Sequence, residues 1–422
     1  MKKVAIITLG CKVNQYESNA IANKLEHNGF EVSQGLCVAD IYIINTCAVT
    51  NEAEKKSRGI IAKVKKLNPS ADLYICGCSS QNNASRFEYE NVKAIIGTSQ
   101  KDKIADLIIS NNLNTLFVNT QIDKTYTENY LAKGERTRAV IKIQEGCNNF
   151  CSYCLIPYLR GRERSRAFDE VKKEVEFQSK NTNEIVFAGI NLSSYGKDLE
   201  PKKSLADVAI LMREFPNIRF RFSSLEQDII SKEFLEVLSQ TPNFAPHFHL
   251  SLQSGCDNTL KAMNRKYNSQ EYYNKIKLIR EYFENPAITT DVIVGFPTET
   301  EQDALDTYNF VKKCKFAKMH IFPYSKRDGT LACKLKNIAT NVKERATTLG
   351  ELDKKMQQEY TNLFIGKTLS VLVEREHNGF YEGHSQNFIK CYIKSDKKLK
   401  SNQFVDVIVN SIYLDGAICS VK

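Results

Sequence analysis

Three closely spaced cysteines stand in the run Gly146-Cys147-Asn148-Asn149-Phe150-Cys151-Ser152-Tyr153-Cys154. A zinc site would need a fourth ligand, usually from a second Cys-x2-Cys pair or from two histidines, and none follows at such a spacing. Cysteine thiolates also hold iron-sulfur clusters, and three thiolates leave one iron of a 4Fe-4S cluster without a protein ligand. The run therefore predicts a 4Fe-4S cluster with one open iron. The alternative is a set of three buried structural cysteines.

The residues around this run alternate between strand-like and helix-like patterns. Strands are predicted at residues 139–144, 184–188, 219–223, 247–252, 289–294 and 319–323. Helices are predicted between several of them, at residues 168–180, 271–283 and 300–314. With the cysteines directly after the first strand, this pattern indicates a partial (β/α)6 barrel. In such barrels the reacting groups lie at the carboxyl ends of the strands.

The first 120 residues show a βαβαβ pattern, which is typical of a parallel sheet covered by helices. Its strands are predicted at 4–9, 41–44 and 73–75, and its helices at 17–28 and 52–67. Each strand runs into a cysteine, namely Cys11, Cys47 and Cys78. Because ligands of open α/β sheets bind beyond the carboxyl ends of the strands, we expect a second three-thiolate site there. The alternative is that these are small apolar residues at strand ends. Cys76, one residue inside its strand, is interpreted as a packing residue.

Two further segments divide the chain. The polar stretch 119–135, which contains Lys133-Gly134-Glu135, is typical of a linker. Residues 341–364 favour a helix, and short alternating stretches then indicate a small all-β module, at 369–373, 388–393 and 404–409. We therefore expect an α/β multidomain protein with a parallel-sheet domain, a partial barrel and a small β-barrel. The expected domains are residues 1–125, 133–362 and 364–422.

Composition indicates the cellular compartment of the protein and the kind of partner it binds. The chain has 422 residues, 13 cysteines and a net charge of +10. Its first apolar stretch, 4–9, is too short for a secretion signal, and no later one approaches the ~20 apolar residues that span a bilayer. We expect a cytoplasmic protein without a membrane partner. In the reducing cytoplasm, closely spaced cysteines are metal ligands or catalytic thiols more often than disulfides. The positive charge favours a polyanionic partner. The remaining cysteines are interpreted as structural: Cys37, Cys256, Cys314, Cys333, Cys391 and Cys419.

The first cysteine run, with Tyr153 before its last cysteine and a barrel strand before it, resembles the radical S-adenosylmethionine (SAM) enzymes. In that family the open iron chelates the amino and carboxylate groups of SAM. One electron from the cluster cleaves SAM to methionine and a 5′-deoxyadenosyl radical, which takes hydrogen from an unactivated carbon. The resemblance implies a radical SAM barrel here, with Cys147, Cys151 and Cys154 as the metal ligands.

The second cysteine trio resembles the N-terminal domain of the methylthiotransferases, whose three cysteines hold an auxiliary 4Fe-4S cluster. The matching segments are Leu9-Gly10-Cys11-Lys12-Val13-Asn14-Gln15-Tyr16-Glu17, Asn45-Thr46-Cys47-Ala48-Val49-Thr50 and Gly77-Cys78-Ser79-Ser80-Gln81. The resemblance continues through residues 161–166, 221–226, 249–255, 291–299 and 322–325, so it covers nearly the whole chain. It implies a transferase with two 4Fe-4S clusters that cleaves one SAM and takes a methyl group from another. The C-terminal module resembles the TRAM domain, a small RNA-binding β-barrel.

The segments 9–17 and 161–166 look most like the branch that acts on N6-threonylcarbamoyladenosine in tRNA, at the adenosine 3′ of the anticodon (position 37). Sister branches act on isopentenyladenosine in tRNA or on an aspartate of a ribosomal protein. The resemblance also implies a low-potential electron donor such as flavodoxin or ferredoxin, and a sulfur donor. A hypothesis of another class is a non-catalytic iron-sulfur RNA-binding sensor. The full set of six barrel strands and the two separate trios favour the enzyme, because sensing needs only one cluster.

Several residues are candidates for binding SAM. Glycines at strand ends let the backbone approach a ligand closely, although such glycines also occur in ordinary turns. The other candidates are carried over from the family. The set is Tyr153, Gly189, Ser224, Glu226, Gln253 and Gly295. His247 and His249 point to one face of their strand and could be metal ligands, but a barrel-lining role is favoured because the cluster needs no histidine.

Two groups of basic residues are candidates for binding RNA. Arg160, Arg162, Arg164 and Arg166 alternate after the cysteine run, and guanidinium groups suit phosphate oxygens. Their alternative is a salt-bridged surface loop, and Glu163 within the run weakens a purely electrostatic interpretation. The second group lies on a hairpin-like segment near Phe388 and Tyr392 and consists of Lys394, Lys397, Lys398 and Lys400. Its alternative is a plain solvated face.

Overall fold

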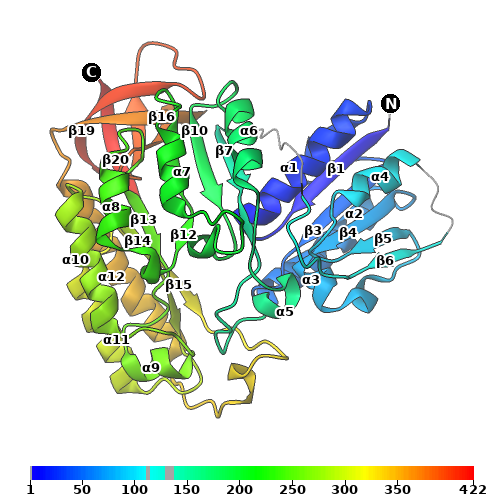
Figure 1. Cartoon of the computed structure of the whole chain (residues 1–422), viewed down its shortest axis with the longest axis horizontal. Helices are drawn as coiled ribbons and strands as arrows, with labels where there is room; N and C mark the ends of the chain where they lie inside the picture. Colours follow the sequence, from blue (N-terminus) through cyan, green and yellow to red (C-terminus); the bar gives the residue numbers. More distant parts are fainter. Residues whose placement is uncertain (1, 111–114, 129–136) are drawn as a thin grey trace.

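The computed structural model describes residues 2–110, 115–128 and 137–422 (Figure 1). The chain forms an N-terminal sheet with helices on both faces, a central partial barrel and a C-terminal closed barrel. The α/β multidomain fold expected from the sequence is thus confirmed. Residues 129–135 of the expected linker, which include Lys133-Gly134-Glu135, lie outside the described residues.

The N-terminal sheet is parallel throughout, in the order β2-β1-β3-β4-β5-β6. Its strands are β1 (Lys3–Thr8), β2 (Glu31–Gln34), β3 (Ile41–Thr46), β4 (Asp72–Gly77), β5 (Val92–Ile96) and β6 (Phe117–Asn119). Its helices are α1 (Lys12–His27), α2 (Asn51–Leu67), α3 (Cys78–Asn82) and α4 (Lys103–Ser110), with a 3-10 turn η1 (Ala84–Phe87). Val4 and Ile6 of β1 pack under α1 and α4, whereas Ala5 and Ile7 pack under α2. Both faces are covered, which explains why the strands are continuous apolar runs.

The central barrel consists of parallel strands in two sheets, ordered β11-β10-β7 and β12-β13-β14-β15. The strands are β7 (Arg138–Lys142), β10 (Glu184–Ala188), β11 (Arg219–Phe222), β12 (Ser224–Leu225), β13 (His247–Leu250), β14 (Ala287–Val294) and β15 (Lys318–Pro323). The covering helices are α6 (Phe168–Gln178), α7 (Leu205–Met212), α8 (Lys232–Ser239), α10 (Ser269–Tyr282), α11 (Glu301–Cys314) and α12 (Val342–Asn362). Short elements complete it: α5 (Ile156–Arg160), α9 (Asp257–Ala262), β8 (Gln144–Glu145), β9 (Arg164–Ser165), η2 (Leu192–Ser194), η3 (Gln227–Ile229) and η4 (Ala332–Lys334). All six predicted barrel strands are present, and the third is divided at Ser223.

The interior of this barrel is polar. Ala139 and Ile141 of β7 lie in the core beneath the helices. Because side chains alternate along a strand, Arg138, Val140 and Lys142 face inward. The same alternation on the other strands turns apolar side chains toward the helices. It brings mostly charged, hydroxyl and imidazole side chains to the interior, together with a few apolar ones such as Val186. The barrel therefore encloses a space suited to a polar ligand.

The C-terminal barrel has the closed strand order β16-β17-β18-β20-β19. Its strands are β16 (Thr368–His377), β17 (Phe380–Ser385), β18 (Lys390–Lys394), β19 (Phe404–Tyr413) and β20 (Gly416–Val421). It covers the amino-terminal ends of the central strands. There Arg219, the first residue of β11, donates hydrogen bonds to the Ser370 and His384 carbonyls, and the rings of His247 and Phe388 stack with centroids 4.0 Å apart.

One detail of the C-terminal module was predicted wrongly. The segment that carries the four lysines, from Lys394 at the end of β18 into the loop before β19, is not hairpin-like, because β18 and β19 are not neighbours in the barrel. The two aromatic residues near this segment pack inside the protein. Phe388 packs against His247 of the central barrel, and Tyr392 is 5% exposed.

The N-terminal sheet contacts both edges of the central barrel. At the β7 edge, Tyr16 of α1 packs near Val140 and donates a hydrogen bond of 2.9 Å to Glu174 of α6. At the β15 edge, Arg327 forms an ion pair of 2.8 Å with Glu54 of α2. The sheet thus spans the open side of the partial barrel. Among the residues described here, no helix is both long and apolar enough to cross a bilayer.

Candidate functional site

The first cysteine trio lies in a loop that is fixed at both ends. Strands β8 and β9 pair on either side of it, and the Cys147 backbone N–H donates to the Gly161 carbonyl at 3.1 Å. Gly146 has a φ of +74°, and a Cβ there would lie 1.9 Å from the Arg162 carbonyl oxygen. Only glycine therefore allows the loop to close this tightly.

Each sulfur of this trio accepts a hydrogen bond. The Asn149 N–H donates to Cys147 Sγ and the Ile156 N–H to Cys154 Sγ, both at 3.4 Å, and Arg265 Nη1 donates to Cys151 Sγ at 3.3 Å. Burial raises the pKa of Cys147 to about 11 and that of Cys154 to about 12, so without a metal both thiols are protonated at neutral pH. Metal ions displace such protons. Three thiols with these donors fit an iron-sulfur cluster.

Arg265 also connects this loop to Glu226, one of the predicted SAM-binding residues. Its guanidinium forms an ion pair with Glu226 and donates at 3.1 Å to the Tyr267 hydroxyl. No motif or periodicity in the sequence singles out Arg265, which lies in the turn after α9. Tyr153, the second candidate near the loop, packs with Met263 and Phe296.

The other SAM candidates have structural roles of their own. Gly295 has a φ of +72°, and a Cβ there would approach Val342 to 2.6 Å. A Cβ at Gly189 would lie 2.9 Å from Gln144. Gln253, with a φ of 73°, donates its backbone N–H to the Asp291 carbonyl at 2.8 Å, and Ser224 is exposed on β12. Contact of these residues with SAM stays a prediction.

The second trio lies at the carboxyl edge of the N-terminal sheet. Cys11 precedes α1, Cys47 follows β3 and Cys78 begins α3 after β4. The three thiols are close enough for Cys11 and Cys78 to influence the pKa of Cys47, which burial raises to about 11. Gly10 has a φ of +102°, and a Cβ there would lie 3.0 Å from Cys47 Sγ. This second set of three thiols also fits a cluster with an open iron.

A buried network of charges lies between the two trios. Arg160 donates to Cys78 Sγ at 3.3 Å and pairs with Glu145 at 2.7 Å and Glu17 at 3.1 Å. Glu145 also accepts the Gly146 N–H at 2.9 Å, one residue before Cys147. Burial alone would raise the pKa of Glu145, but Arg160 and Lys142 lower it to about 2. A single guanidinium is therefore linked to both cysteine sites.

The rest of the network balances these charges. Lys142 pairs with Glu17 at 2.9 Å and with Glu128 at 2.6 Å, and Lys101 pairs with Glu17. All six side chains are buried. From sequence alone, the lysines and glutamates resemble ordinary surface residues. The one feature of the sequence that points to this network is the position of Glu17 on the helix that begins directly after Cys11.

The prediction that four alternating arginines contact phosphate is wrong for three of them. Arg160, Arg164 and Arg166 are 1%, 5% and 1% exposed. Arg164 donates to the carbonyls of Arg160 and Arg162, and Arg166 pairs with Glu174. Their guanidinium groups are used inside the protein. Arg162 is exposed, so phosphate contact stays a prediction for this residue alone.

The four predicted RNA-binding lysines of the C-terminal barrel are all exposed: Lys394, Lys397, Lys398 and Lys400. Lys394 lies over the Phe380 ring at 5.7 Å from its centroid. RNA contact by these residues stays a prediction.

A cavity of about 780 Å³ opens where the three bodies meet. The N-terminal sheet contributes Gly10, Cys11 and Lys12, the central barrel contributes Val140 and Val186, and the C-terminal barrel contributes residues such as Arg375 and His384. Cys11 of the second trio thus borders a space that all three bodies enclose.

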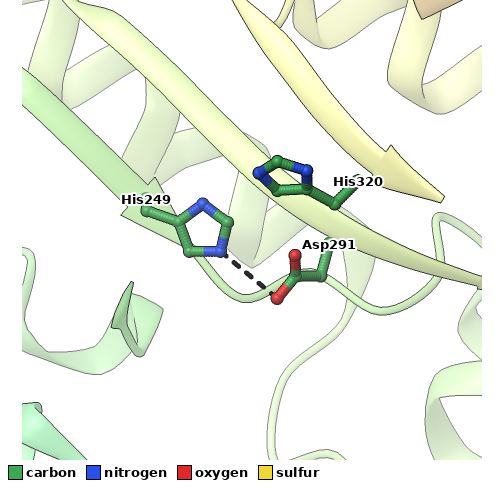
Figure 2. A group of neighbouring side chains, drawn as sticks. All are labelled: His249, Asp291 and His320. Carbon is green, nitrogen blue, oxygen red and sulfur yellow. Dashed lines mark ion pairs between the residues drawn. The ribbon is translucent and has the colours of Figure 1, made fainter. Parts of the chain in front are cut away.

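Figure 2 shows a group on adjacent barrel strands, with His249 from β13, Asp291 from β14 and His320 from β15. Their ligand atoms lie within 4.8 Å of one another, a donor set that suits a divalent metal. Hydrogen bonds satisfy most of the polar atoms of this group without a metal ion. His247 Nε2 and His249 Nδ1 lie 3.0 and 2.9 Å from Thr289 Oγ1, and His249 Nε2 lies 3.2 Å from Asp291. If His247 donates to Thr289 and Thr289 to His249, then His249 donates to Asp291. The inward-facing histidines agree with the favoured barrel-lining role.

Two family models match the chain. Residues 141–311 match the Radical SAM superfamily, and residues 3–97 match a family described as Uncharacterized protein family UPF0004. The two matches contain the first and the second cysteine trio, respectively.

Curated relatives match almost the whole chain. The threonylcarbamoyladenosine tRNA methylthiotransferase MtaB of Bacillus subtilis (strain 168) is 36% identical over 414 residues, which cover 94% of this chain and 92% of the relative. The MtaB protein of Thermotoga maritima is 35% identical over 425 residues, which cover 99% of this chain and 96% of the relative. The tRNA-2-methylthio-N(6)-dimethylallyladenosine synthase of Acetivibrio thermocellus is 33% identical over 437 residues, which cover 99% of this chain and 91% of the relative.

Solved structures share the fold. The radical SAM methyltransferase TsrM from Kitasatospora setae, with cobalamin and a [4Fe-4S] cluster bound, superposes with a TM-score of 0.56 at 14% identity, covering 90% of this chain and 80% of that one. The cobalamin-dependent radical SAM enzyme OxsB gives 0.55 at 13% identity, covering 84% and 56%. At such identities the likeness concerns the fold alone.

Proposed function

This chain belongs to the radical SAM methylthiotransferases, and from that premise we propose that it adds a methylthio group to C2 of N6-threonylcarbamoyladenosine at position 37 of tRNA. The observation that carries the proposal is the arrangement of two cysteine trios around one buried network, with Arg160 linked to both. The relatives named for threonylcarbamoyladenosine support the substrate. The polar barrel interior supports it too, because the isopentenyl group of the sister branch is apolar.

When bound, the two clusters and SAM would supply the radical, the sulfur atom and the methyl group. Cys147, Cys151 and Cys154 would hold the cluster at which SAM is cleaved, and Cys11, Cys47 and Cys78 the cluster that carries the sulfur. Arg265 and Arg160 donate hydrogen bonds to one sulfur of each trio and so stabilise the thiolate form. We assign contacts with SAM to Tyr153, Gly189, Ser224, Glu226, Gln253 and Gly295.

The partners follow from the same proposal. A tRNA would present its adenosine to the cavity between the three bodies. Arg162 and the four exposed lysines of the β18–β19 segment would contact its phosphates. The reaction also requires a low-potential electron donor such as flavodoxin or ferredoxin, and a sulfur donor. We place the enzyme in the cytoplasm, where tRNA is modified.

Mass spectrometry of tRNA nucleosides from a deletion strain tests the proposal. The methylthiolated form of threonylcarbamoyladenosine should disappear and the unmethylthiolated form should accumulate, and a plasmid copy should restore the original pattern. A plasmid copy with Cys47→Ala should fail to restore it. Persistence of the methylthiolated nucleoside in the deletion strain contradicts the proposal, and loss of methylthiolated isopentenyladenosine would indicate the sister substrate.

A reconstitution experiment separates an enzyme from a sensor. Under anaerobic conditions the full-length protein should bind roughly eight irons, as expected for two four-iron clusters. With dithionite and SAM it should form 5′-deoxyadenosine. Bound iron without 5′-deoxyadenosine would favour the RNA-binding sensor.

A further inference from the structure

Lys12 is a cation without a partner in the cavity between the three bodies. It is the first residue of α1, directly after Cys11, and its side chain is exposed to the cavity. Within the described part of the chain it has neither an ion pair nor a side-chain hydrogen bond. The other basic residues that line this cavity are paired. Arg138 pairs with Glu374, Arg375 with Glu382 at 2.7 Å and Lys390 with Asp415 at 3.3 Å.

The surroundings of Lys12 favour an anion. The two carboxylates that line the cavity are held by other cations, Glu374 by Arg138 and Glu382 by Arg375. Neither is left to offset the charge of Lys12. A ligand with one negative charge would relieve this imbalance.

The position of Lys12 limits which anion can reach it. Its neighbour Cys11 belongs to the trio assigned to the sulfur-carrying cluster, so the reacting C2 of adenine has to come close to this residue. C2 and the carbon that bears N6 are separated by a single ring atom, so the N6 substituent enters the same space. The threonylcarbamoyl substituent ends in a carboxylate, whereas an isopentenyl group carries no charge. A base enters such a pocket by rotating about its backbone, so the base and its substituent reach deeper than the phosphates.

We propose that Lys12 determines substrate specificity by pairing with the threonyl carboxylate of N6-threonylcarbamoyladenosine. This inference rests on the proposed function and goes beyond it by naming the residue that reads the substituent. Lys12 positions the substrate and takes no part in bond making. Loss of one charged hydrogen bond in a recessed site lowers kcat/KM roughly 10- to 100-fold.

The test compares two anticodon stem-loop RNAs, one with N6-threonylcarbamoyladenosine and one with its methyl ester, in which the carboxylate is neutral. The wild-type enzyme should methylthiolate the acid with a kcat/KM roughly 10- to 100-fold above that of the ester. Lys12→Gln should reduce activity on the acid by a similar factor and leave almost no difference between acid and ester. Lys390→Gln is the matched control, because it removes a paired cation from the same cavity, and it should keep the wild-type preference. Lys12→Arg keeps the charge and should retain part of it.

Further readouts separate recognition from damage to the neighbouring cluster. Iron content, the visible spectrum and 5′-deoxyadenosine formation should be unchanged in Lys12→Gln. Lys12→Met serves as a second neutral variant if glutamine lowers the iron content. A neutral variant that still prefers the acid overturns the proposal, as does an equal loss on acid and ester, which indicates phosphate contact. A wild-type enzyme inactive on the acid stem-loop overturns the proposed function itself.

Discussion

At the scale of single residues, Arg160 is the most consequential side chain of the candidate site. It donates to a cysteine of one trio and to the carboxylate that holds the loop of the other. A buried charge is tolerated only when its partners are present, because removing one partner leaves the others desolvated and unpaired. The same guanidinium therefore serves stability and the geometry of both sites.

Arg160→Gln should lower the free energy of unfolding by about 3–5 kcal/mol, because Glu17 and Glu145 lose their shared cation inside the protein. Urea unfolding of the reconstituted enzyme measures this change. Arg162→Gln is the control: this neighbour is exposed, and its substitution should change stability by less than about 0.5 kcal/mol. Equal stabilities of the two variants would contradict the importance given to the buried network.

At the scale of elements, the first residues of the barrel strands form a second buried set of charges beneath the C-terminal barrel. Glu184 of β10 lies among Arg138, Arg219 and Arg221. Burial alone would raise the pKa of Glu184, but the three arginines lower it to about 2. Arg219 and Arg221 in turn donate to carbonyls of the C-terminal barrel, and Arg138 pairs with Glu374 of that barrel. The Glu184 carboxylate therefore supports the contact between the two barrels.

This contact should weaken in acid. A lowered carboxyl pKa contributes stability that is complete above the ordinary value of 4.5 and is lost as the pH falls toward 2. Glu184 should thus account for about 3 kcal/mol of the stability lost over that range. Urea unfolding at several pH values, compared between the wild type and Glu184→Gln, isolates this part. The exposed Glu376, changed to Gln, should leave the pH dependence unaltered. Parallel pH profiles for the wild type and Glu184→Gln would refute the assignment.

Much of this architecture could be predicted because alternation in the sequence reports which faces of an element are buried. The strands of the central barrel and the order of the N-terminal elements followed from such patterns, and parallel topology then placed Cys11, Cys47 and Cys78 at one edge. Charged residues were harder to interpret. Arg160 and Arg166 have the same sequence appearance as exposed Arg162, and only their partners from distant segments, such as Glu17, explain their burial. Pairings between distant segments leave no local signal.

At the scale of the whole molecule, the N-terminal sheet is held against both edges of the central barrel. This arrangement fixes the second cysteine trio relative to the first. At the β15 edge Arg327 reaches Asn51 and Glu54 at the start of α2, and Asn51 also donates to Ser325 Oγ and the Lys326 carbonyl. Arg327 supplies the charged part of this contact. Loss of this contact would let the sheet move without removing a cysteine.

Arg327→Ala should therefore separate the two half-reactions. We expect nearly normal iron content and 5′-deoxyadenosine formation, but roughly tenfold less methylthiolated product for each 5′-deoxyadenosine formed, because misplacement of reacting groups is costly. Both products can be measured in one assay by mass spectrometry. Arg86→Ala removes the more exposed partner of Glu54, which lies 3.7 Å away, and should keep normal coupling. Unchanged coupling in Arg327→Ala would show that the remaining contacts between the sheet and the barrel are sufficient, and would contradict the role given to Arg327.

The charge network between the trios also limits how the protein can be recombined. Glu17 comes from the N-terminal sheet, whereas Lys142 and Arg160 come from the central barrel. A chimera that joins this sheet to an unrelated radical SAM barrel would leave Glu17 with Lys101 alone, and this barrel would present Lys142 and Arg160 to a foreign sheet without Glu17. The N-terminal sheet and the central barrel are separate segments of the sequence, but each supplies charged partners to the other, so they can be exchanged only together.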